Sequence, residues 1–340
     1  MATIKEVAKA CDVSIATVSN ILNGKGRVGE ETRRRILSTA KEMGYVPNMM
    51  AKNLKQRQTK MIGIITEDLT VFNCADIVDG IHEYLEEKEY TFLLGNLRLF
   101  KKYDNAFYHH ERYHTEVEEE FRIMRSKQVA GVIYVGAHCR EMKSIPRNYN
   151  VPIVVAYGFA TDHETPSVIY DDEQAAYNAT MELFNKGYRK IGLIAGEMES
   201  HHTIDRQRGY QKALYENKVL YNPELVQYGD WNREQGYQAC KELMRHKVDA
   251  IFSMNDVMAA GVYDYMNEHS LTVGKDIGLI GFDNREISQV FQPELSTIAL
   301  PLSEIGHKAA DLLIKKIEEP GFEPESVYKI ECNLITRESE

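Results

Sequence analysis

One motif in this chain has the spacing of a metal site. His110-Glu-Arg-Tyr-His114 matches His-Glu-x-x-His, in which two histidines one helical turn apart bind zinc while the glutamate acts as a base. A peptidase also needs a third ligand and a substrate cleft, and the aromatic, histidine-rich stretch around 98–115 offers no evident scaffold for either. A zinc hydrolase is therefore the rival class, and an adventitious or structural metal is a second alternative. The favoured interpretation is a solvated helix or the rim of a cleft.

Other catalytic signatures are missing from the sequence. It contains no Walker loop, no Gly-x-Ser-x-Gly and no carboxylate pair that can be placed across a scissile bond. Gly24-Lys-Gly-Arg-Val-Gly29 matches Gly-x-Gly-x-x-Gly, but a helix precedes it where a dinucleotide site needs a strand. We therefore expect a protein that is not an enzyme and has no cofactor and no metal. A sugar-responsive kinase or hydrolase with a DNA-binding head is the alternative.

Short polar residues near the N-terminus could contact DNA. Thr3-Ile-Lys-Glu6 has the spacing of a capping box, which predicts a helix through Ala10. After the turn Cys11-Asp-Val13, Ser14 can cap a second helix over Ile15–Leu22. Two short helices joined this tightly suggest a helix-turn-helix, and an ordinary helical hairpin is the alternative.

In a helix-turn-helix the second helix enters the major groove with its exposed N-terminal residues. Asn20 could bond an adenine edge, and apolar side chains could touch thymine methyl groups. Hydroxyl groups are better suited to phosphates, which position the protein without reading sequence. The base-edge candidates are Ile15, Ala16 and Asn20, and the other DNA-contact candidates are Thr3, Ser14, Thr17 and Ser19.

The segment between the helices and the first strand-like run is polar and basic. Residues 48–60 resemble a linker, yet Met50–Gln56 could form a short helix on DNA or on a partner chain. Leu54, between Lys52 and Lys55, would then suit a wedge that opens the minor groove. The alternative is a solvated linker whose leucine packs on the body.

The chain has 340 residues, a length that fits two or three domains of roughly 100–200 residues each. Charge is divided unevenly along it. The formal net charge is −10, but residues 1–60 carry +7 and the remainder −17. A small basic head on an acidic body is expected when only the head approaches phosphates. The five cysteines are scattered and form no Cys-x-x-Cys pair, and no apolar signal core or membrane-length run is present. We therefore expect reduced thiols and a cytoplasmic protein that does not contact a membrane.

The run from Thr3 to Leu54 resembles the lactose/galactose repressor (LacI/GalR) family of bacterial transcriptional regulators. The resemblance is carried there by Val13-Ser-Ile-Ala-Thr-Val-Ser19, Gly44-Tyr-Val-Pro47 and Ala51-Lys-Asn-Leu54. It continues in the same order through Met61-Ile-Gly-Ile-Ile65, Arg206-Gln-Arg-Gly-Tyr210, Asn255-Asp-Val-Met-Ala259, Ile280-Gly-Phe-Asp283 and Ser296-Thr-Ile. The matches therefore span nearly the whole chain.

The resemblance implies a body like that of periplasmic sugar-binding proteins, with two α/β subdomains joined by three crossings. Apolar runs separated by helix-length amphipathic segments agree, because such alternation predicts doubly wound parallel sheets. These runs are Met61–Thr66, Thr91–Leu94, Gly131–Val135, Ile153–Ala156, Lys190–Ala195, Ala250–Ser253 and Ile277–Phe282. We expect a helix-turn-helix head at 1–47, a hinge at 48–60 and an effector-binding and dimerisation body at 61–340. Within the body we expect an N-subdomain of about 61–160 and 291–320 and a C-subdomain of about 161–290 and 321–340.

The resemblance also implies an effector pocket between the subdomains, where doubly wound sheets bind ligands. The chemistry of the matching positions fits a polyol, because arginine donates, aspartate accepts from two hydroxyls and tryptophan can stack on a sugar. The candidates are Phe72, Tyr157, Arg206, Trp231, Asn255 and Asp283. The structural alternative is a capping Asn255, a solvated Arg206 and a Trp231 anchored in the core.

Departures from the family pattern leave the ligand open. Glu67-Asp-Leu-Thr-Val-Phe-Asn-Cys74 replaces a run that often begins with proline, Tyr157 replaces a frequent acidic residue, and Leu300 replaces a frequent glutamine. We expect a homodimeric regulator, most simply a repressor, of a palindromic double-stranded DNA operator. Its effector is expected to be a galactose- or glucose-like mono- or disaccharide. A purine-responsive or phosphocarrier-responsive regulator of the same family is the alternative.

Overall fold

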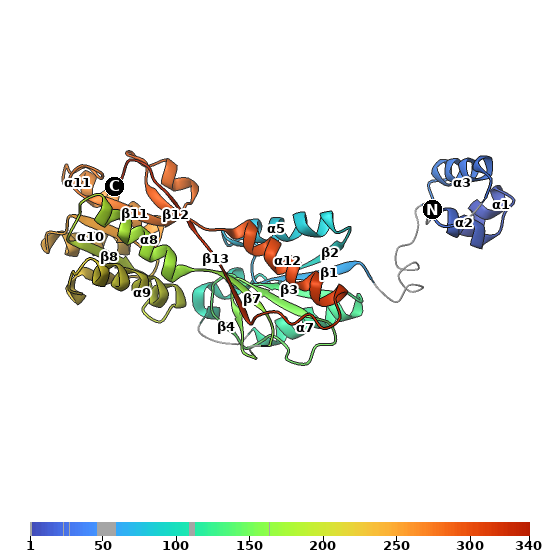
Figure 1. The fold of residues 1–340 in the computed structure, drawn as a ribbon, viewed down its shortest axis with the longest axis horizontal. Coiled ribbons are helices and arrows are strands. Elements are labelled where there is room, and N and C mark those ends of the chain that lie inside the picture. The colour runs from blue at the N-terminus through green and yellow to red at the C-terminus, as the bar shows by residue number, and fades with distance from the viewer. Residues whose placement is uncertain (1, 23, 27, 46–58, 109–112, 163) are drawn as a thin grey trace. The chain divides into compact units, whose positions relative to one another are not determined.

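The computed structural model describes residues 2–22, 24–26, 28–45, 59–108, 113–162 and 164–340. The chain separates into two compact units, Met1–Lys60 and Met61–Glu340, and each is described by itself (Figure 1). Among the described residues, no helix combines the length and the apolar character that crossing a membrane requires. Hinge residues Lys52, Leu54 and Lys55 lie outside the described part of the chain.

The head contains three helices, α1 (Ile4–Ala10), α2 (Ile15–Leu22) and α3 (Glu30–Glu42). The predicted capping box is present at the start of α1: the Thr3 amide donates to the Glu6 carboxylate at 2.7 Å, and the Thr3 hydroxyl accepts from the Glu6 amide at 3.4 Å. A small core holds the helices together, formed by Val7, Ala8, Cys11, Val18, Ile21, Ile36 and Ala40. The predicted helix-turn-helix is confirmed.

The first subdomain of the body is built on a parallel sheet of six strands in the order β13-β7-β5-β3-β1-β2. Helices α5 and α12 cover one face of this sheet and α7 covers the other (Figure 1). Ile64 of β1 accordingly packs on the first face and Ile65 on the second. In chain order the elements are β1 (Met61–Thr66), α5 (Cys74–Glu87), β2 (Thr91–Asn96), α6 (Leu99–Tyr103), η1 (Asp104–Tyr108), α7 (His114–Ser126), β3 (Gly131–Val135), β4 (Glu141–Met142), β5 (Ile153–Ala156), β6 (Phe159–Ala160), β7 (Ser167–Tyr170), α12 (Leu302–Glu318) and β13 (Val327–Ile330), with β4 and β6 forming a separate short pair.

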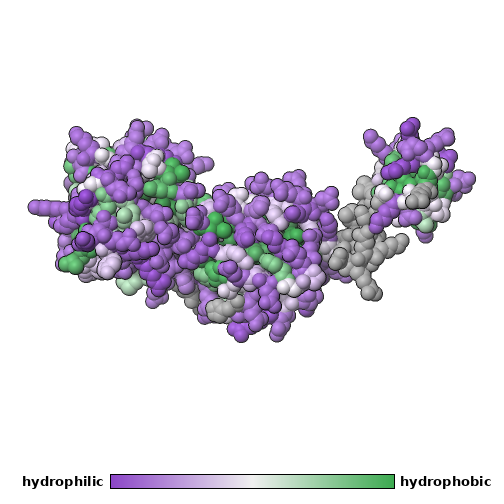
Figure 2. Space-filling view, viewed as in Figure 1, coloured by the Kyte–Doolittle hydropathy of each residue, from purple (hydrophilic) through white to green (hydrophobic). Residues whose placement is uncertain are grey.

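The second subdomain has a sheet in the order β14-β12-β11-β10-β8-β9, parallel except for β14. Helix α8 packs on α9, and α10 packs on α11. The visible face of the body is largely hydrophilic, as expected when the apolar side chains fill the sheet–helix layers (Figure 2). The elements are α8 (Asp172–Asn185), β8 (Ile191–Ala195), α9 (His201–Glu216), η2 (Pro223–Leu225), β9 (Val226–Tyr228), α10 (Arg233–Arg245), β10 (Ala250–Ser253), α11 (Asp256–Glu268), β11 (Gly278–Asp283), η3 (Glu286–Gln289), β12 (Ser296–Ala299) and β14 (Asn333–Ile335).

All of the predicted apolar runs form strands, with ends that shift by at most two residues. The subdomain boundaries differ from those expected near 160, 290 and 320. The chain crosses between the sheets at 171, 300–301 and 331–332, because Ser167–Tyr170 and Val327–Ile330 extend the first sheet and Ser296–Ala299 the second. Such short runs give no periodicity that assigns them to a sheet from sequence.

Helices α5 and α12 pack with their backbones in contact. A Cβ built on Gly80 would lie 2.1 Å from the carbonyl oxygen of Ser303, and one on Gly306 would lie 2.0 Å from that of Ile77. Only glycine allows this approach at either position. The two helices therefore form one closely joined layer over the first sheet.

Candidate functional site

The second helix of the head presents the residues that were predicted to contact DNA. Ser14, Ile15, Ala16 and Asn20 are exposed, and Ile15 keeps 44% of its surface accessible. The Ser14 hydroxyl accepts a hydrogen bond from the Thr17 amide at 3.0 Å, so it caps α2 as predicted. The Ser14 and Thr17 hydroxyl oxygens are also 2.8 Å apart, which places two hydroxyls at this helix N-terminus.

Thr17 and Ser19 are half-buried, and the exposed Thr3 hydroxyl is engaged by the Glu6 carboxylate at 3.0 Å. The helix-turn-helix therefore exposes an apolar side chain, a small side chain and an amide on one short helix. This combination can contact base edges, while the capped N-terminus can contact phosphate.

The body contains a cavity of about 700 Å³ between its two sheets. Parallel strands end at this edge of both sheets: Tyr157 directly follows β5, Asn255 lies just beyond β10 and Asp283 ends β11. All of the effector candidates line the cavity, namely Phe72, Tyr157, Arg206, Trp231, Asn255 and Asp283. The topology therefore brings together residues that are far apart in the chain.

Arg206 is held by groups within the protein rather than solvated. It is 2% exposed, its Nε donates to Asp172 Oδ1 at 2.6 Å, and its other nitrogens donate to the Tyr170 hydroxyl at 2.8 Å and to the Met254 carbonyl. Its guanidinium also lies 3.6 Å from the centroid of the Phe282 ring. Burial opposes ionisation of Asp172, but the charges of His202 and Arg206 lower the pKa of this carboxyl below its usual value. The positive charge of Arg206 is thus already compensated.

His202 connects the two subdomains beside this ion pair. Its Nδ1 lies 2.7 Å from Asp172 Oδ2, and its Nε2 lies 3.2 Å from the hydroxyl of Tyr157. Tyr157 and Tyr170 come from the first sheet, whereas His202 and Arg206 lie on α9 of the second subdomain. A continuous buried hydrogen-bond network therefore crosses from one subdomain to the other at the wall of the cavity.

Gly196, which has no side chain, and Asn255 together position Trp231. A Cβ on Gly196 would lie 2.0 Å from the indole ring, so only glycine leaves room for the tryptophan. The Asn255 Nδ2 donates to the Trp231 carbonyl at 3.1 Å, while its Oδ1 accepts from the Met258 amide at 2.6 Å and caps α11. The capping interpretation of Asn255 is therefore correct as well, and its side chain also holds the backbone of Trp231 at the cavity wall.

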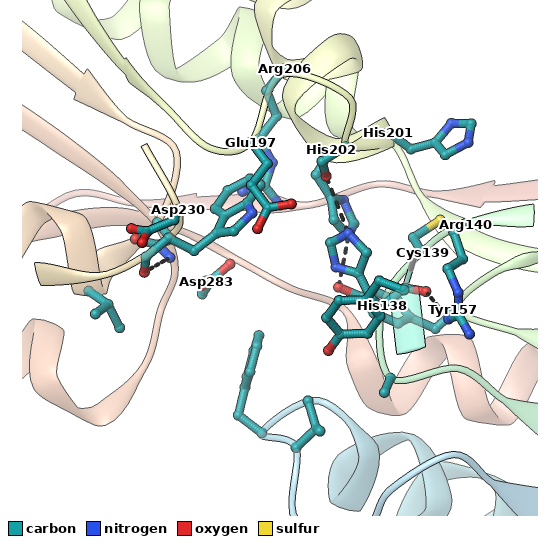
Figure 3. A pocket seen from close by; sticks show the side chains of 18 of the residues that line it. His138, Cys139, Arg140, Tyr157, Glu197, His201, His202, Arg206, Asp230 and Asp283 are labelled. Atoms are coloured by element: carbon teal, nitrogen blue, oxygen red, sulfur yellow. Dashed lines mark hydrogen bonds between the residues drawn. The ribbon is translucent and has the colours of Figure 1, made fainter. Parts of the chain in front are cut away.

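Asp283 differs from these residues because its carboxyl group makes no hydrogen bond to any residue that the structure describes. Figure 3 shows its carboxylate on the same side of the cavity as Asp230 and Glu197, across from His138 and His202. Burial raises the pKa of Asp283 to about 8, although the charge of Arg206 opposes the shift. A carboxyl group that faces a cavity without an internal donor is suited to accept hydrogen bonds from a ligand.

The histidine-rich segment lies partly outside the described residues, which exclude His110 and Glu111. His114 begins α7, and its Nε2 lies 3.1 Å from the Glu118 carboxylate. In the part of the chain that the structure describes, no three His, Cys, Asp or Glu side chains are grouped so as to hold a metal ion. The structure thus assigns a structural contact to the second histidine of the motif.

Several cavity residues escaped the sequence analysis. His138 follows the predicted strand at Gly131–Val135, so its position after a buried strand could have revealed it. Burial lowers the pKa of His138 well below its usual value, which keeps its imidazole neutral. Tyr108 belongs to the aromatic stretch that was interpreted as a solvated helix or the rim of a cleft, but no strand or helix periodicity singled it out, because it lies on a short 3₁₀ helix.

An exposed helix-turn-helix and a body with a ligand-sized cavity between two doubly wound sheets define a DNA-binding regulator that senses a small molecule. Family models agree: residues 3–48 match the bacterial regulatory proteins of the lacI family, and residues 180–340 match a periplasmic binding protein-like domain. The chain belongs to the LacI family of transcriptional repressors.

Curated relatives match over the full length of the chain. The HTH-type transcriptional repressor PurR of Escherichia coli is 31% identical over 100% of this chain and 97% of its own length. The ribose operon repressor of Haemophilus influenzae is 27% identical over 100% of this chain and 98% of its own length. These relatives differ in the ligands that their names indicate, so membership of the family leaves the effector of this chain open.

Solved structures agree with the fold. A transcriptional regulator CelR–cellobiose complex is 26% identical with a TM-score of 0.64 and covers 100% of both chains. A Lac repressor dimer bound to operator and the anti-inducer ONPF is 22% identical with a TM-score of 0.80, covering 99% of this chain and 98% of that chain. The predicted fold class, a helix-turn-helix head with a two-subdomain α/β body, is confirmed.

Proposed function

We propose that this repressor is controlled by a neutral polyhydroxyl effector, a galactose- or glucose-like mono- or disaccharide, bound between the subdomains of the body. The single observation that carries the proposal is the Asp283 carboxyl, which lines the cavity with Trp231 and accepts no hydrogen bond from the residues that the structure describes. A carboxylate accepts from two adjacent sugar hydroxyls, and an indole packs on the C–H face of a pyranose.

The charges around the cavity support a ligand without phosphate or carboxylate groups. Arg206 is paired with Asp172, and Arg140 is paired with Glu67 at 2.7 Å. The carboxylates that line the cavity include Glu197, Glu199 and Asp230, whereas burial raises the pKa of Asp283 to about 8. An anion would meet these carboxylates. Of the three lining guanidinium groups, those of Arg140 and Arg206 are already neutralised and that of Arg285 lies 4.9 Å from the Phe72 ring centroid, so a neutral ligand is favoured.

A purine is the second candidate effector. Support for it comes from the 31% identity to PurR and from aromatic side chains at the cavity, which can stack on a planar base.

The operator-binding unit is proposed to be a homodimer, because two heads on a symmetric site supply the contacts and the half-site spacing that one short head lacks. The hinge wedge at Leu54 remains a prediction of the sequence.

A ligand panel tests the proposal directly. The operator is first selected from randomised duplex DNA. Operator affinity and the fluorescence of Trp231, the sole tryptophan, are then measured with glucose, galactose, cellobiose, hypoxanthine and glucose 6-phosphate. We expect a neutral sugar to give a saturable fluorescence change and to change operator affinity by about 5- to 150-fold, the usual range of allosteric coupling. A response to hypoxanthine alone would support the purine, and a response to the phosphosugar alone would contradict the charge argument.

The head gives a further prediction. Asn20→Ala is expected to cost about 1–3 kcal/mol of operator affinity and to relax the preference at one base pair of each half-site, as loss of a base-edge contact does. Ser38→Ala is the matched control, since Ser38 is exposed on α3 and bonds only the Arg35 carbonyl in the described structure. Equal losses on operator and random DNA would show that Asn20 does not read a base.

A further inference from the structure

The cavity extends beyond the region around Arg206, Trp231 and Asp283. Its volume of about 700 Å³ falls within the ~300–1,000 Å³ of pockets that hold drug-sized ligands, and it exceeds what one pyranose ring fills. The rest of its wall comes from the first subdomain, where Phe100 and Tyr108 follow β2 and His138 follows β3. Both subdomains therefore contribute aromatic side chains to one cavity.

The part of the cavity wall that follows β2 in the chain packs on a buried ion pair between Arg140 and Glu67. The two terminal nitrogens of Arg140, Nη2 and Nη1, donate to the Glu67 carboxylate at 2.7 and 2.9 Å. Nη2 also donates to the Tyr113 hydroxyl at 2.9 Å. The same guanidinium lies 5.2 Å from the Phe107 ring centroid and 5.6 Å from that of Tyr108. Three aromatic rings from 107–113 thus surround a charge that is held in place by Glu67.

Backbone contacts also attach this wall to the sheet. The Lys101 amide donates to Asp68 Oδ2 at 3.0 Å, and the Leu99 amide donates to the Glu67 carbonyl at 2.8 Å. Leu99 and Phe107 are fully buried. The Tyr108 ring is consequently presented to the cavity by a packed segment, and a preorganised surface loses little entropy when a ligand binds.

The chemistry of this wall matches a second sugar ring. Tyr108 and His138 lie with their ring centroids 4.7 Å apart, and His138 Nε2 lies 3.3 Å from the Ser200 hydroxyl. An aromatic face suits the C–H face of a pyranose, while phenol, imidazole and hydroxyl groups suit its hydroxyls. Arg140 brings no uncompensated charge because Glu67 neutralises it, so the second ring is also uncharged.

We propose that Tyr108, with Phe100 and His138, forms a second subsite that makes the repressor selective for a neutral disaccharide over its component monosaccharide. This inference rests on the proposed sugar effector and adds its size and a specificity-determining residue. One ring occupies the region of Asp283 and Trp231, and the other packs on Tyr108. The disaccharide gains the second contact and the monosaccharide lacks it.

The test compares paired ligands on four forms of the full chain. Binding of cellobiose, maltose and lactose is measured against glucose and galactose by calorimetry, with wild type, Tyr108→Ala, Tyr108→Phe and Tyr215→Ala. Tyr215 is the matched control because it is 83% exposed on α9. We expect one disaccharide to bind wild type at least tenfold more tightly than its monosaccharide. Tyr108→Ala should remove that difference through loss of disaccharide affinity alone, whereas Tyr108→Phe should retain most of it.

The outcomes separate this inference from the proposed function. Monosaccharide binding that Tyr108→Ala leaves unchanged shows that the variant is folded. Equal affinity of wild type for disaccharide and monosaccharide, or disaccharide affinity that survives in Tyr108→Ala, overturns the second subsite while leaving the sugar effector intact. Failure of wild type to bind any of these sugars overturns both.

Discussion

Asp283→Ala is expected to abolish the response to the effector while operator affinity without effector stays nearly that of wild type. Hydrogen bonds to a charged group contribute about 1.5–3 kcal/mol each, so losing two of them lowers ligand affinity by at least tenfold. The head lies in a separate compact unit, and Asp283 holds no other described side chain in place. Fluorescence titration and operator binding measure the two effects. The control is Asp264→Ala, a half-buried carboxylate on α11 that pairs with Arg233 and is not among the lining residues of the cavity. Unchanged ligand affinity in Asp283→Ala would remove this residue from the site.

The same group gives the prediction a pH signature. Because burial raises the pKa of Asp283 to about 8, the empty cavity holds it mostly protonated at neutral pH. Sugar hydroxyls favour the charged form, so binding releases a proton and affinity rises with pH until it levels off above the free-state pKa. Folding has the opposite dependence, since a raised pKa in the folded state means that stability falls as pH rises from the unfolded value near 3.8 through about 8. Asp283→Asn should remove both dependences.

Arg206→Ala is expected to destabilise the body by about 3–5 kcal/mol, the usual cost of breaking a buried ion pair from one side. Asp172 would remain buried without the Arg206 donor and with His202 as its remaining partner, and the hydroxyl of Tyr170 and the carbonyl of Met254 would each lose a donor. Urea unfolding of the full chain measures the change. Arg208→Ala, on the same helix but exposed, is the matched control and should alter stability by less than about 0.5 kcal/mol.

A double variant distinguishes the ion pair from simple loss of packing. If Arg206 acts chiefly by compensating Asp172, then removing both side chains should cost less than the sum of the single losses. Additive losses would mean that the contact with the Phe282 ring matters more than the charge. The expected contrast with Asp283 is also informative, because Arg206→Ala should lower stability whereas Asp283→Ala should not.

Apolar strand runs and helix-capping residues depend on neighbours in the sequence, so the sequence alone could predict the strands and the helix starts. The Thr3–Glu6 capping box and the apolar run at Ala250–Ser253 depend on near neighbours, and both appear in the structure as expected. The gathering of Arg206, Trp231, Asn255 and Asp283 at one cavity was anticipated only through family resemblance. Their separate contacts depend on partners distant in sequence, which no spacing reveals.

Arg206 illustrates what could not be predicted. As a lone arginine on a helix it was compatible with either a solvated side chain or a ligand donor, and its actual partners include Asp172 and Met254. Tyr108 was equally hidden, since the segment after β2 was recognised only by its aromatic and histidine content. The buried pair that supports it joins Glu67, directly after β1, to Arg140, directly before β4, and contacts between residues so distant in sequence become visible only in the folded structure.

The backbone contact between α5 and α12 has a mechanical consequence. Helix α12 starts immediately after the crossing at 300–301, and Gly80 and Gly306 join it to α5 without intervening side chains. Relative rotation of the subdomains therefore has to be absorbed by the three short crossings. Pro301 stiffens one of them, because its ring fixes φ. Bending should then concentrate at 171 and at 331–332, and we expect the two subdomains to turn as rigid bodies about an axis near those two crossings.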